Sequence, residues 1–419
     1  MEQIRAAYRP HFLTIKLPFP IKENLSEYST EELSRLIHEY IHFLQNLHTP
    51  WGLYTGLRTY EEISYLFLDV NKTQETLYLP YEADYPESVI KNKIICNLGD
   101  GRRSTISDLK LDLDGLEFDS QVSFVLKEEL TSIGNKEYST ILIELETKLA
   151  RIQQIELGAW IIKESMAQIF QDKIFKPESS RNNILPYDFV KVYCEQNAPK
   201  TATDSKKILT ICWASLFSMS PGKEFVKLAK FAEDNFKMTS EELFLYHITN
   251  SSIRVNNDRT LSFNQFMGEI NEKYITVIET FLAMNCSYFK YVLTQKDLIE
   301  THQILMSLYD NPNIQNIERI MEFMGEPAIF GEENTSCFTF LKGDESSKEP
   351  IFKLFSYGLI NRFLLSKNVT CPNLDLCNQV DGFQKKYECI SNPLKIEYEC
   401  PMFYASRIVG IENRDIDLR

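Results

Sequence analysis

The clearest chemical pattern in this sequence lies near its N-terminus, at His38-Glu39-Tyr40-Ile41-His42. On a helix, residues four apart project from one face, so both imidazoles can reach one metal ion. A zinc ion lowers the pKa of a bound water towards about 7, and a neighbouring carboxylate such as Glu39 can act as general base on that water. The pattern predicts a Zn²⁺ site that hydrolyses peptide bonds. The alternative is a helix that carries two unrelated histidines.

A hydrolytic tetrahedral zinc needs a third protein ligand and leaves its fourth position for water. His48 follows His42 at a spacing that resembles the metzincin peptidases. That family has a glycine where this chain has Gln45, and the glycine breaks the helix so that the third histidine turns back to the metal. With Gln45 we expect the helix to continue and to carry His48 off the shared face. Glu156 is a further carboxylate candidate.

Residues 157–167 resemble the second zinc helix of the gluzincin peptidases, where a motif of the form E-[GAS]-x-A supplies a glutamate ligand. Glu164, Ser165 and Ala167 match this motif, and Gln45, three residues after the first motif, also looks like several bacterial gluzincin groups. The resemblance implies a zinc metallopeptidase in which Glu164 is the third ligand. It also implies that the small residues let two helices approach closely. It covers only two short segments of the chain.

Other residues have side chains that could stabilise an oxyanion or bind a metal ion, but they belong to no recognisable motif. A peptidase usually has a further donor for the oxyanion, and Tyr187, His247 and Arg254 are available for that role. The acidic segment 111–119 lacks the EF-hand register, so a hairpin explains it better than calcium does. Four cysteines near the C-terminus have wide spacings, which favour buried thiols over a second metal site; they are Cys371, Cys377, Cys389 and Cys400.

Two helices must position the motif residues. Apolar residues recur at helical spacing from Ser29 to His48, and Ser29 with Glu32 forms a capping-box pattern at the start. Pro50 should end this helix. We expect a second helix from about Gly158 to Phe175.

Between these helices, the short alternating runs from Tyr60 to Leu126 predict hairpins of a small antiparallel sheet. These runs are Leu77–Tyr81, Lys93–Asn97 and Leu109–Asp119. Helix is expected to resume from about Tyr138.

These elements predict an α+β fold in three parts. Residues 1–180 would form a zincin-like catalytic domain with a small antiparallel sheet. Amphipathic helical spacing over roughly 181–330 predicts a mainly helical domain, residues 181–341, that walls the substrate cleft. The polar segment 343–349 reads as a linker or exposed loop, and residues 350–419 would form a cysteine-rich C-terminal unit.

The composition and charge of the chain disfavour some classes of binding partner. The formal charge is −14 and no block of lysine or arginine stands out, which disfavours nucleic acid. No apolar run approaches the length of a membrane span, and the N-terminus does not resemble a signal peptide. The nine cysteines are an odd number and suggest reduced thiols. We therefore expect a cytoplasmic enzyme whose partner is a protein or peptide substrate.

The sequence leaves the substrate open. Without an unfolding ATPase motif, a narrow set of cytosolic protein targets is the more natural expectation. Two rival hypotheses belong to other classes: a catalytically inactive zinc-binding protein, and a metal-free helical protein-interaction module. Glu39 favours the enzyme, because a closed structural site has no use for that carboxylate and needs a fourth ligand.

Overall fold

The computed structural model describes most of the chain. The described residues are 6–9, 13–22, 24–72, 76–101, 123–133, 136–146, 153–175, 184–256, 259–282, 287–294, 296–331, 348–367, 371–372, 393–394, 400–412 and 414–418.

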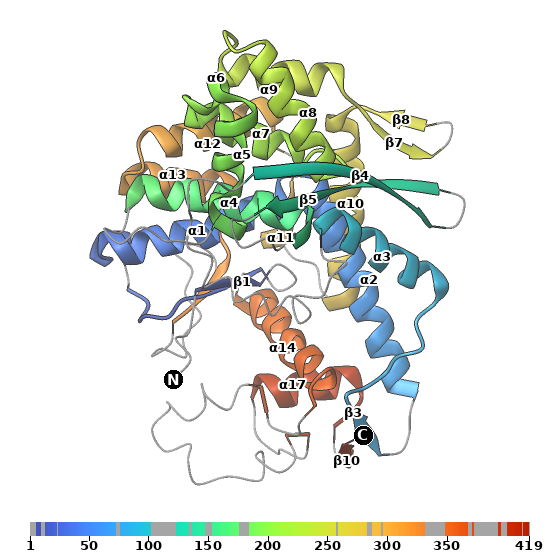
Figure 1. Ribbon diagram of the computed structural model, residues 1–419. Helices are drawn as coiled ribbons and strands as arrows, with labels where there is room; N and C mark the ends of the chain where they lie inside the picture. Colours follow the sequence, from blue (N-terminus) through green and yellow to red (C-terminus); the bar gives the residue numbers. More distant parts are fainter. Residues whose placement is uncertain are drawn as a thin grey trace.

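Helices dominate these residues (Figure 1). The N-terminal ones are α1 (Thr30–Leu47), α2 (Pro50–Lys72), α3 (Glu87–Asp100) and α4 (Ala159–Ile174). A one-turn π-helix, η4 (Ile184–Asp188), leads into the next group. That group comprises α5 (Phe189–Asn197), α6 (Pro199–Ala202), α7 (Ser205–Ser215), α8 (Pro221–Asp234), α9 (Ser240–Asn250), α10 (Phe263–Leu282), α11 (Ser287–Leu293), α12 (Leu298–Asp310) and α13 (Ile314–Met324). The C-terminal helices are α14 (Lys348–Leu364) and α17 (Pro401–Val409).

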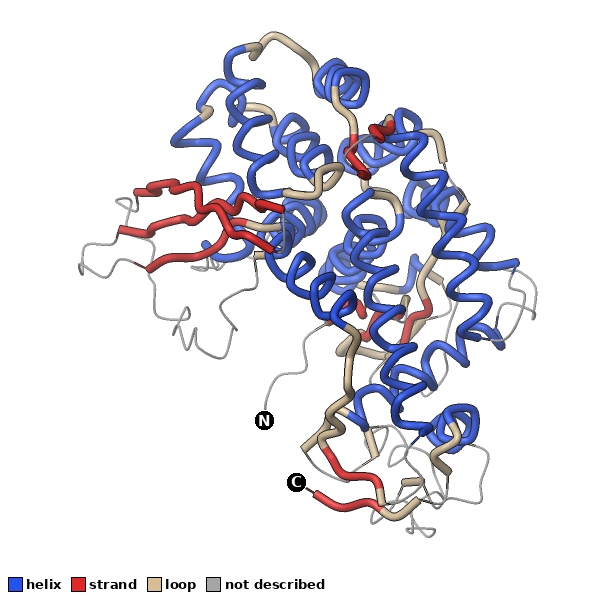
Figure 2. Tube along the Cα trace, turned by 90° about the vertical axis from the view of Figure 1, so that its right-hand side faces the viewer, coloured by secondary structure: helices blue, strands red, loops and turns tan. Residues whose placement is uncertain are grey.

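The strands form four small sheets. β4 (Ser123–Ile133), β5 (Lys136–Glu146) and β6 (Gln153–Leu157) make an antiparallel sheet that projects from the helices in Figure 2. β1 (Ala7–Arg9) pairs antiparallel with β2 (Thr14–Lys16), which pairs parallel with β9 (Ala328–Phe330). β3 (Leu77–Leu79) pairs parallel with β10 (Ile416–Leu418), and β7 (Ile253–Asn256) forms a hairpin with β8 (Arg259–Leu261). The architecture is α+β, as the sequence predicted.

The helix that carries the metal motif begins where the sequence indicated. Ser29 accepts a hydrogen bond from the Glu32 backbone N–H, and the Glu32 side chain accepts one from Ser29, which completes the capping box. Such a cap contributes about 1 kcal/mol to helix stability. α1 ends at Leu47 with His48 as its C-cap. Pro50 opens α2, because proline suits the first helical position, where its missing N–H has no partner to lose.

The second expected helix is also present. α4 runs from Ala159 to Ile174, with Gly158 as N-cap and Phe175 as C-cap. It packs along α1, and Figure 1 shows α4 above α1 and β1 below it. The buried residues of α4 include Ile161, Ile162 and Met166, and these join one core with the apolar face of α1. This packing places two helices that are far apart in sequence side by side.

The expected hairpins between the two helices are largely wrong. Residues 60–72 belong to α2, and the run Lys93–Asn97 lies inside α3. Gly101 ends α3 with φ +75°, a left-handed conformation that glycine adopts readily. Leu77–Leu79 is a strand, but its partner is β10 rather than a hairpin neighbour. Segment 109–119 lies outside the described residues.

The antiparallel sheet occurs later in the chain than expected. Helix was predicted from about Tyr138, but residues 136–146 form the central strand β5. Ile141 and Ile143 are buried while Leu142 and Glu144 are more exposed, and this period of two is that of a strand. Beyond α4, helices predominate among the described residues, in line with the expected helical stretch from 181 to 330. The three-part domain division stays a prediction.

Candidate metal centre

The structure brings His38 and His42 of α1 together with Glu164 of α4. The two histidine Nε2 atoms lie 3.3 Å apart, and Glu164 Oε2 lies 3.4 Å from each of them. These atoms form the one group of possible metal ligands found among the described residues. The side chains of His38, His42 and Glu164 are 9%, 11% and 22% exposed, so only a small part of the group meets solvent.

The size of this triangle fits a tetrahedral ion. With ligand bonds of about 2.0–2.1 Å, tetrahedral coordination places neighbouring ligand atoms about 3.3–3.4 Å apart. A facial octahedral site with the same bond lengths would bring them to about 2.9 Å. The measured edges of 3.3 and 3.4 Å match the tetrahedral case. Two imidazole nitrogens and one carboxylate oxygen are also suitable ligands for a divalent metal of intermediate softness.

The electrostatics of the group also suit a cation. Burial lowers the pKa of His42, but the carboxylate of Glu164 outweighs this effect and raises the pKa to about 9. Burial acts to raise the pKa of Glu164, but His42 and His38 bring it far below the usual range. Without a metal, the group therefore holds a proton between His42 and Glu164. A metal ion would take the place of that proton.

Gln45 fixes the orientation of His42. The Gln45 Nε2 donates to the backbone carbonyl of Lys163 at 3.2 Å, which directs Gln45 Oε1 to His42 Nδ1 at 2.9 Å. Because Oε1 can only accept, a proton sits on Nδ1, and in a metal-bound form the Nε2 lone pair would face the metal. Gln45 is fully buried and joins α1 to the residue before Glu164. The sequence predicts that Gln45 continues the helix and includes it in the gluzincin resemblance, but it does not predict this contact.

Glu39 lies on the same helix, next to His38, and is also buried. Its carboxylate is close enough to His42 to contribute to the raised pKa of that histidine. One carboxylate oxygen, Oε2, accepts a hydrogen bond of 2.6 Å from the backbone N–H of Tyr8 in β1. The predicted general base thus lies beside the metal group and is held by the N-terminal strand.

The two alternative third ligands point elsewhere. The Nε2 of His48 lies 3.0 Å from the carbonyl of Met324, and burial lowers its pKa to about 4, so it is a neutral core histidine. Glu156 is on β6, opposite Leu142 of β5, and is not part of the metal group. Gln45 lets α1 continue, which carries His48 away from the face shared by His38 and His42.

The two small residues of the second helix, Ser165 and Ala167, are both buried. The Ser165 hydroxyl donates to the carbonyl of Pro186 at 2.5 Å and accepts from the Val190 N–H, so it packs against η4 and α5 rather than α1. Ala167 is fully buried. The contacts of Ser165 fix the segment from 185 to 190 against α4.

Of the three candidate oxyanion donors, Tyr187 lies at the metal group. Its ring centre is 6.2 Å from that of His38, in an edge-to-face arrangement. His247 is buried between Phe217 and Phe263, with Glu224 as its nearest carboxylate, and burial lowers its pKa to about 4.

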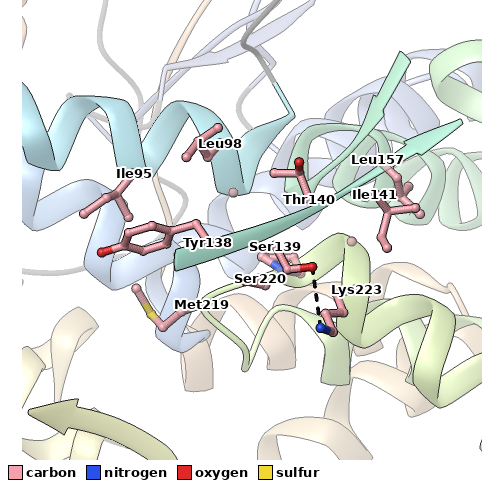
Figure 3. A pocket seen from close by; sticks show the side chains of 13 residues that line it. Ile95, Leu98, Tyr138, Ser139, Thr140, Ile141, Leu157, Met219, Ser220 and Lys223 are labelled. Atoms are coloured by element: carbon pink, nitrogen blue, oxygen red, sulfur yellow. Dashed lines mark hydrogen bonds between the residues drawn. The ribbon is translucent and has the colours of Figure 1, made fainter. Parts of the chain in front are cut away.

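Arg254 lines a separate cavity of about 720 Å³ between α2, β5, β7 and α10. A much smaller pocket adjoins this cavity, where Lys223 of α8 reaches Ser139 of β5 (Figure 3). No metal-group residue lines either space.

The C-terminal cysteines do not form a metal group within the described residues. Cys400 caps α17, where its sulfur accepts from the Phe403 N–H at 3.3 Å, and Cys371 is buried. Cys377, Cys389 and the acidic segment 111–119 lie outside the described residues.

Comparisons with known proteins give no information about the candidate metal centre. The chain matches no family profile, no curated protein and no solved structure. Within the described part of the chain, no helix is long and apolar enough to cross a membrane.

Proposed function

We propose that this protein is a zinc-dependent endopeptidase with His38, His42 and Glu164 as ligands and Glu39 as general base. The observation that carries the proposal is the triangle of ligand atoms with edges of 3.3–3.4 Å beside a buried glutamate. A closed structural site would need a fourth protein ligand. None is present in the metal group of the described residues.

The arrangement we infer is that of a zincin. One helix, α1, supplies both histidines and the base, and a second helix, α4, supplies the glutamate from the adjacent side. Gln45 supports this inference because it links His42 to the backbone beside Glu164 and so sets the distance between the two helices. An orienting hydrogen bond of this kind commonly accompanies metal-binding histidines.

Each residue at the site would have a separate role in hydrolysis. A bound zinc ion would polarise the scissile carbonyl and make a coordinated water more acidic. Glu39 would accept a proton from the water and deliver it to the leaving amine. Tyr187 stands beside His38, where its hydroxyl would be the nearest of the three candidates to a developing oxyanion. His42 would keep its Nδ1 proton throughout and donate it in a hydrogen bond to Gln45 Oε1.

We further propose that the substrates are a narrow set of cytosolic proteins. The small exposure of His38, His42 and Glu164 supports this proposal, because a site that degrades polypeptides broadly needs an open cleft along its metal. The net charge of −14 gives no reason to expect a nucleic-acid partner.

The proposal is tested by comparing the wild-type protein with Glu39→Gln in a cell extract. Newly formed protein N-termini are then identified by mass spectrometry. We expect a short set of new termini with the wild type and none with Glu39→Gln, while both proteins contain one zinc. Equal cleavage by the two proteins would exclude Glu39 as the base, and no new termini with either would exclude the peptidase.

A further inference from the structure

The N-terminal strand β1 is fastened to the helix that carries the metal motif. Tyr8 donates its backbone N–H to Glu39, places its ring edge-on to Phe43 at 6.1 Å, and accepts a hydrogen bond of 3.4 Å from Asn46 through its hydroxyl. Residues 39, 43 and 46 lie on one stripe of a helix. A single residue of β1 therefore covers two turns of α1 on the side next to the metal group.

The pairing of β1 shows which way its N–H groups point. Tyr8 stands opposite Ile15 of β2, and alternate residues of an antiparallel strand direct their N–H towards or away from the partner. Because the Tyr8 N–H reaches Glu39, it points away from β2. β1 is an edge of its sheet among the described residues. An outward N–H on an edge strand is where another peptide would normally pair.

The Glu39 carboxylate and the Tyr8 N–H therefore use each other as hydrogen-bond partners. The carboxylate that should receive a proton from water instead accepts a 2.6 Å hydrogen bond from the main chain. The strand position that could pair with a peptide is blocked by the same contact. His38 and His42 are only 9% and 11% exposed, so little of the metal group is open to an extended polypeptide in this state.

β1 is the element that can leave at least cost. It has three residues, of which Ala7 is exposed and Tyr8 only half-buried, whereas Thr14 and Ile15 of β2 are buried between β1 and β9. Short edge segments with few buried apolar contacts open at much lower free energy than the core. Release of β1 would uncover Glu39 and leave β2, β9 and α1 in place.

From these contacts we propose that β1 is an autoinhibitory strand that closes the metal group and is displaced when a peptide binds. This inference rests on the proposed peptidase function and adds its regulation. In the closed state Tyr8 holds Glu39, and in the open state Glu39 is available to water. A protein substrate that supplies an extended segment would compete with β1 for the same place along α1.

A reversible cross-link tests the inference. Ala7 and Lys16 are directly opposite in the register, and opposed residues of antiparallel strands have Cα atoms about 4.5–5.5 Å apart, within the range of a disulfide. The variant Ala7→Cys/Lys16→Cys would lock β1 to β2 when oxidised and free it when reduced. Lys16→Cys alone, treated identically, controls for the native cysteines.

The primary measurement is the rate at which diethyl pyrocarbonate modifies His38 and His42 in the metal-free protein, followed by mass spectrometry. His48, His247 and His302 are buried and serve as internal references. We expect oxidation to slow modification at His38 and His42 about tenfold or more, because reaction then requires a much larger opening. Equal rates in the oxidised and reduced forms would overturn the inference.

A second pair of variants isolates the hydrogen bond. Tyr8→Pro removes the N–H, which takes no part in the β1–β2 pairing, whereas Tyr8→Ala keeps the N–H and removes only the ring. We expect faster modification of both histidines in Tyr8→Pro than in Tyr8→Ala, and the reverse order would contradict the closing role. These readouts need neither zinc nor activity. A failure of the peptidase proposal, seen in Glu39→Gln, is thereby distinguished from a failure of this one.

Discussion

Replacing Gln45 by alanine tests whether the ligands are pre-arranged for a metal. The variant loses the hydrogen bond to His42 Nδ1 and the one to the Lys163 carbonyl, both from a fully buried side chain. Each lost bond leaves a buried polar partner at a cost of about 1–3 kcal/mol. Loss of an orienting partner typically lowers metal affinity by about 10–100-fold, which corresponds to about 1.4–2.7 kcal/mol.

We expect Gln45→Ala to bind zinc about 10–100-fold more weakly and to unfold at lower temperature, with the zinc-bound form losing more stability than the metal-free form. Zinc affinity is measured by competition with a fluorescent chelator. Gln168→Ala is the matched control, because Gln168 is a buried glutamine of α4 that donates to Asp172 rather than to a metal ligand. Equal zinc affinity in wild type and Gln45→Ala would show that Gln45 does not arrange His42 for metal binding.

Three further predictions concern protons and packing. Because the pKa of His42 is raised to about 9, metal binding near pH 7 should release about one proton. Calorimetry in buffers of different ionisation enthalpy measures this release. If no proton were released, the positive charge assigned to His42 would be wrong. Burial lowers the pKa values of His48, His247 and His302 to about 4 from about 6.5, so the unfolded chain binds more protons between these values. The stability that these three neutral histidines contribute should therefore be complete above about pH 6.5 and fall by up to about 1.4 kcal/mol per pH unit per histidine towards pH 4, and a denaturant midpoint that stays constant from about pH 6.5 to about pH 4 would be inconsistent. In Gly222→Ala, the new methyl group would lie 1.9 Å from the carbonyl oxygen of Leu157 at the end of β6. We therefore expect the free energy of unfolding, measured with a chemical denaturant, to fall by about 1–3 kcal/mol. Unchanged stability would show that α8 can shift freely.

The two helices that carry the candidate metal ligands could be predicted because their signals are local. α1 begins at a capping box and shows an apolar stripe along its whole length, and both features arise within the helix. α4 follows Gly158, which forms its N-cap, and carries a continuous apolar face. Neither helix required knowledge of a distant partner.

The position of the sheet in the sequence was predicted wrongly because its strands and the helix α3 have ambiguous local patterns. α3 buries only Val89 and Leu98 within its bounds, so it shows little helical periodicity. β5 contains a run of β-branched residues, but its strand character depends on pairing with β4 and β6 on either side. β3 depends on β10, which is more than 330 residues away in the sequence.

At the site, the i, i+4 spacing of His38 and His42 is enough to place both on one face. Whether Glu164 reaches them depends on how α1 and α4 pack, and only the structure places these atoms at 3.4 Å. The role of Gln45 involves a backbone carbonyl of another helix, and that of Tyr8 a backbone N–H. Main-chain groups carry no sequence signature, so neither contact could be predicted.

The central claim is that His38, His42 and Glu164 together hold one zinc ion. Native mass spectrometry of the purified protein, after incubation with zinc and removal of excess, measures this directly in the wild type, His38→Ala, Glu164→Ala and His48→Ala. We expect one zinc per chain in the wild type and in His48→Ala, and none in the other two variants. Zinc retained in both His38→Ala and Glu164→Ala, or absent from the wild type, would contradict it.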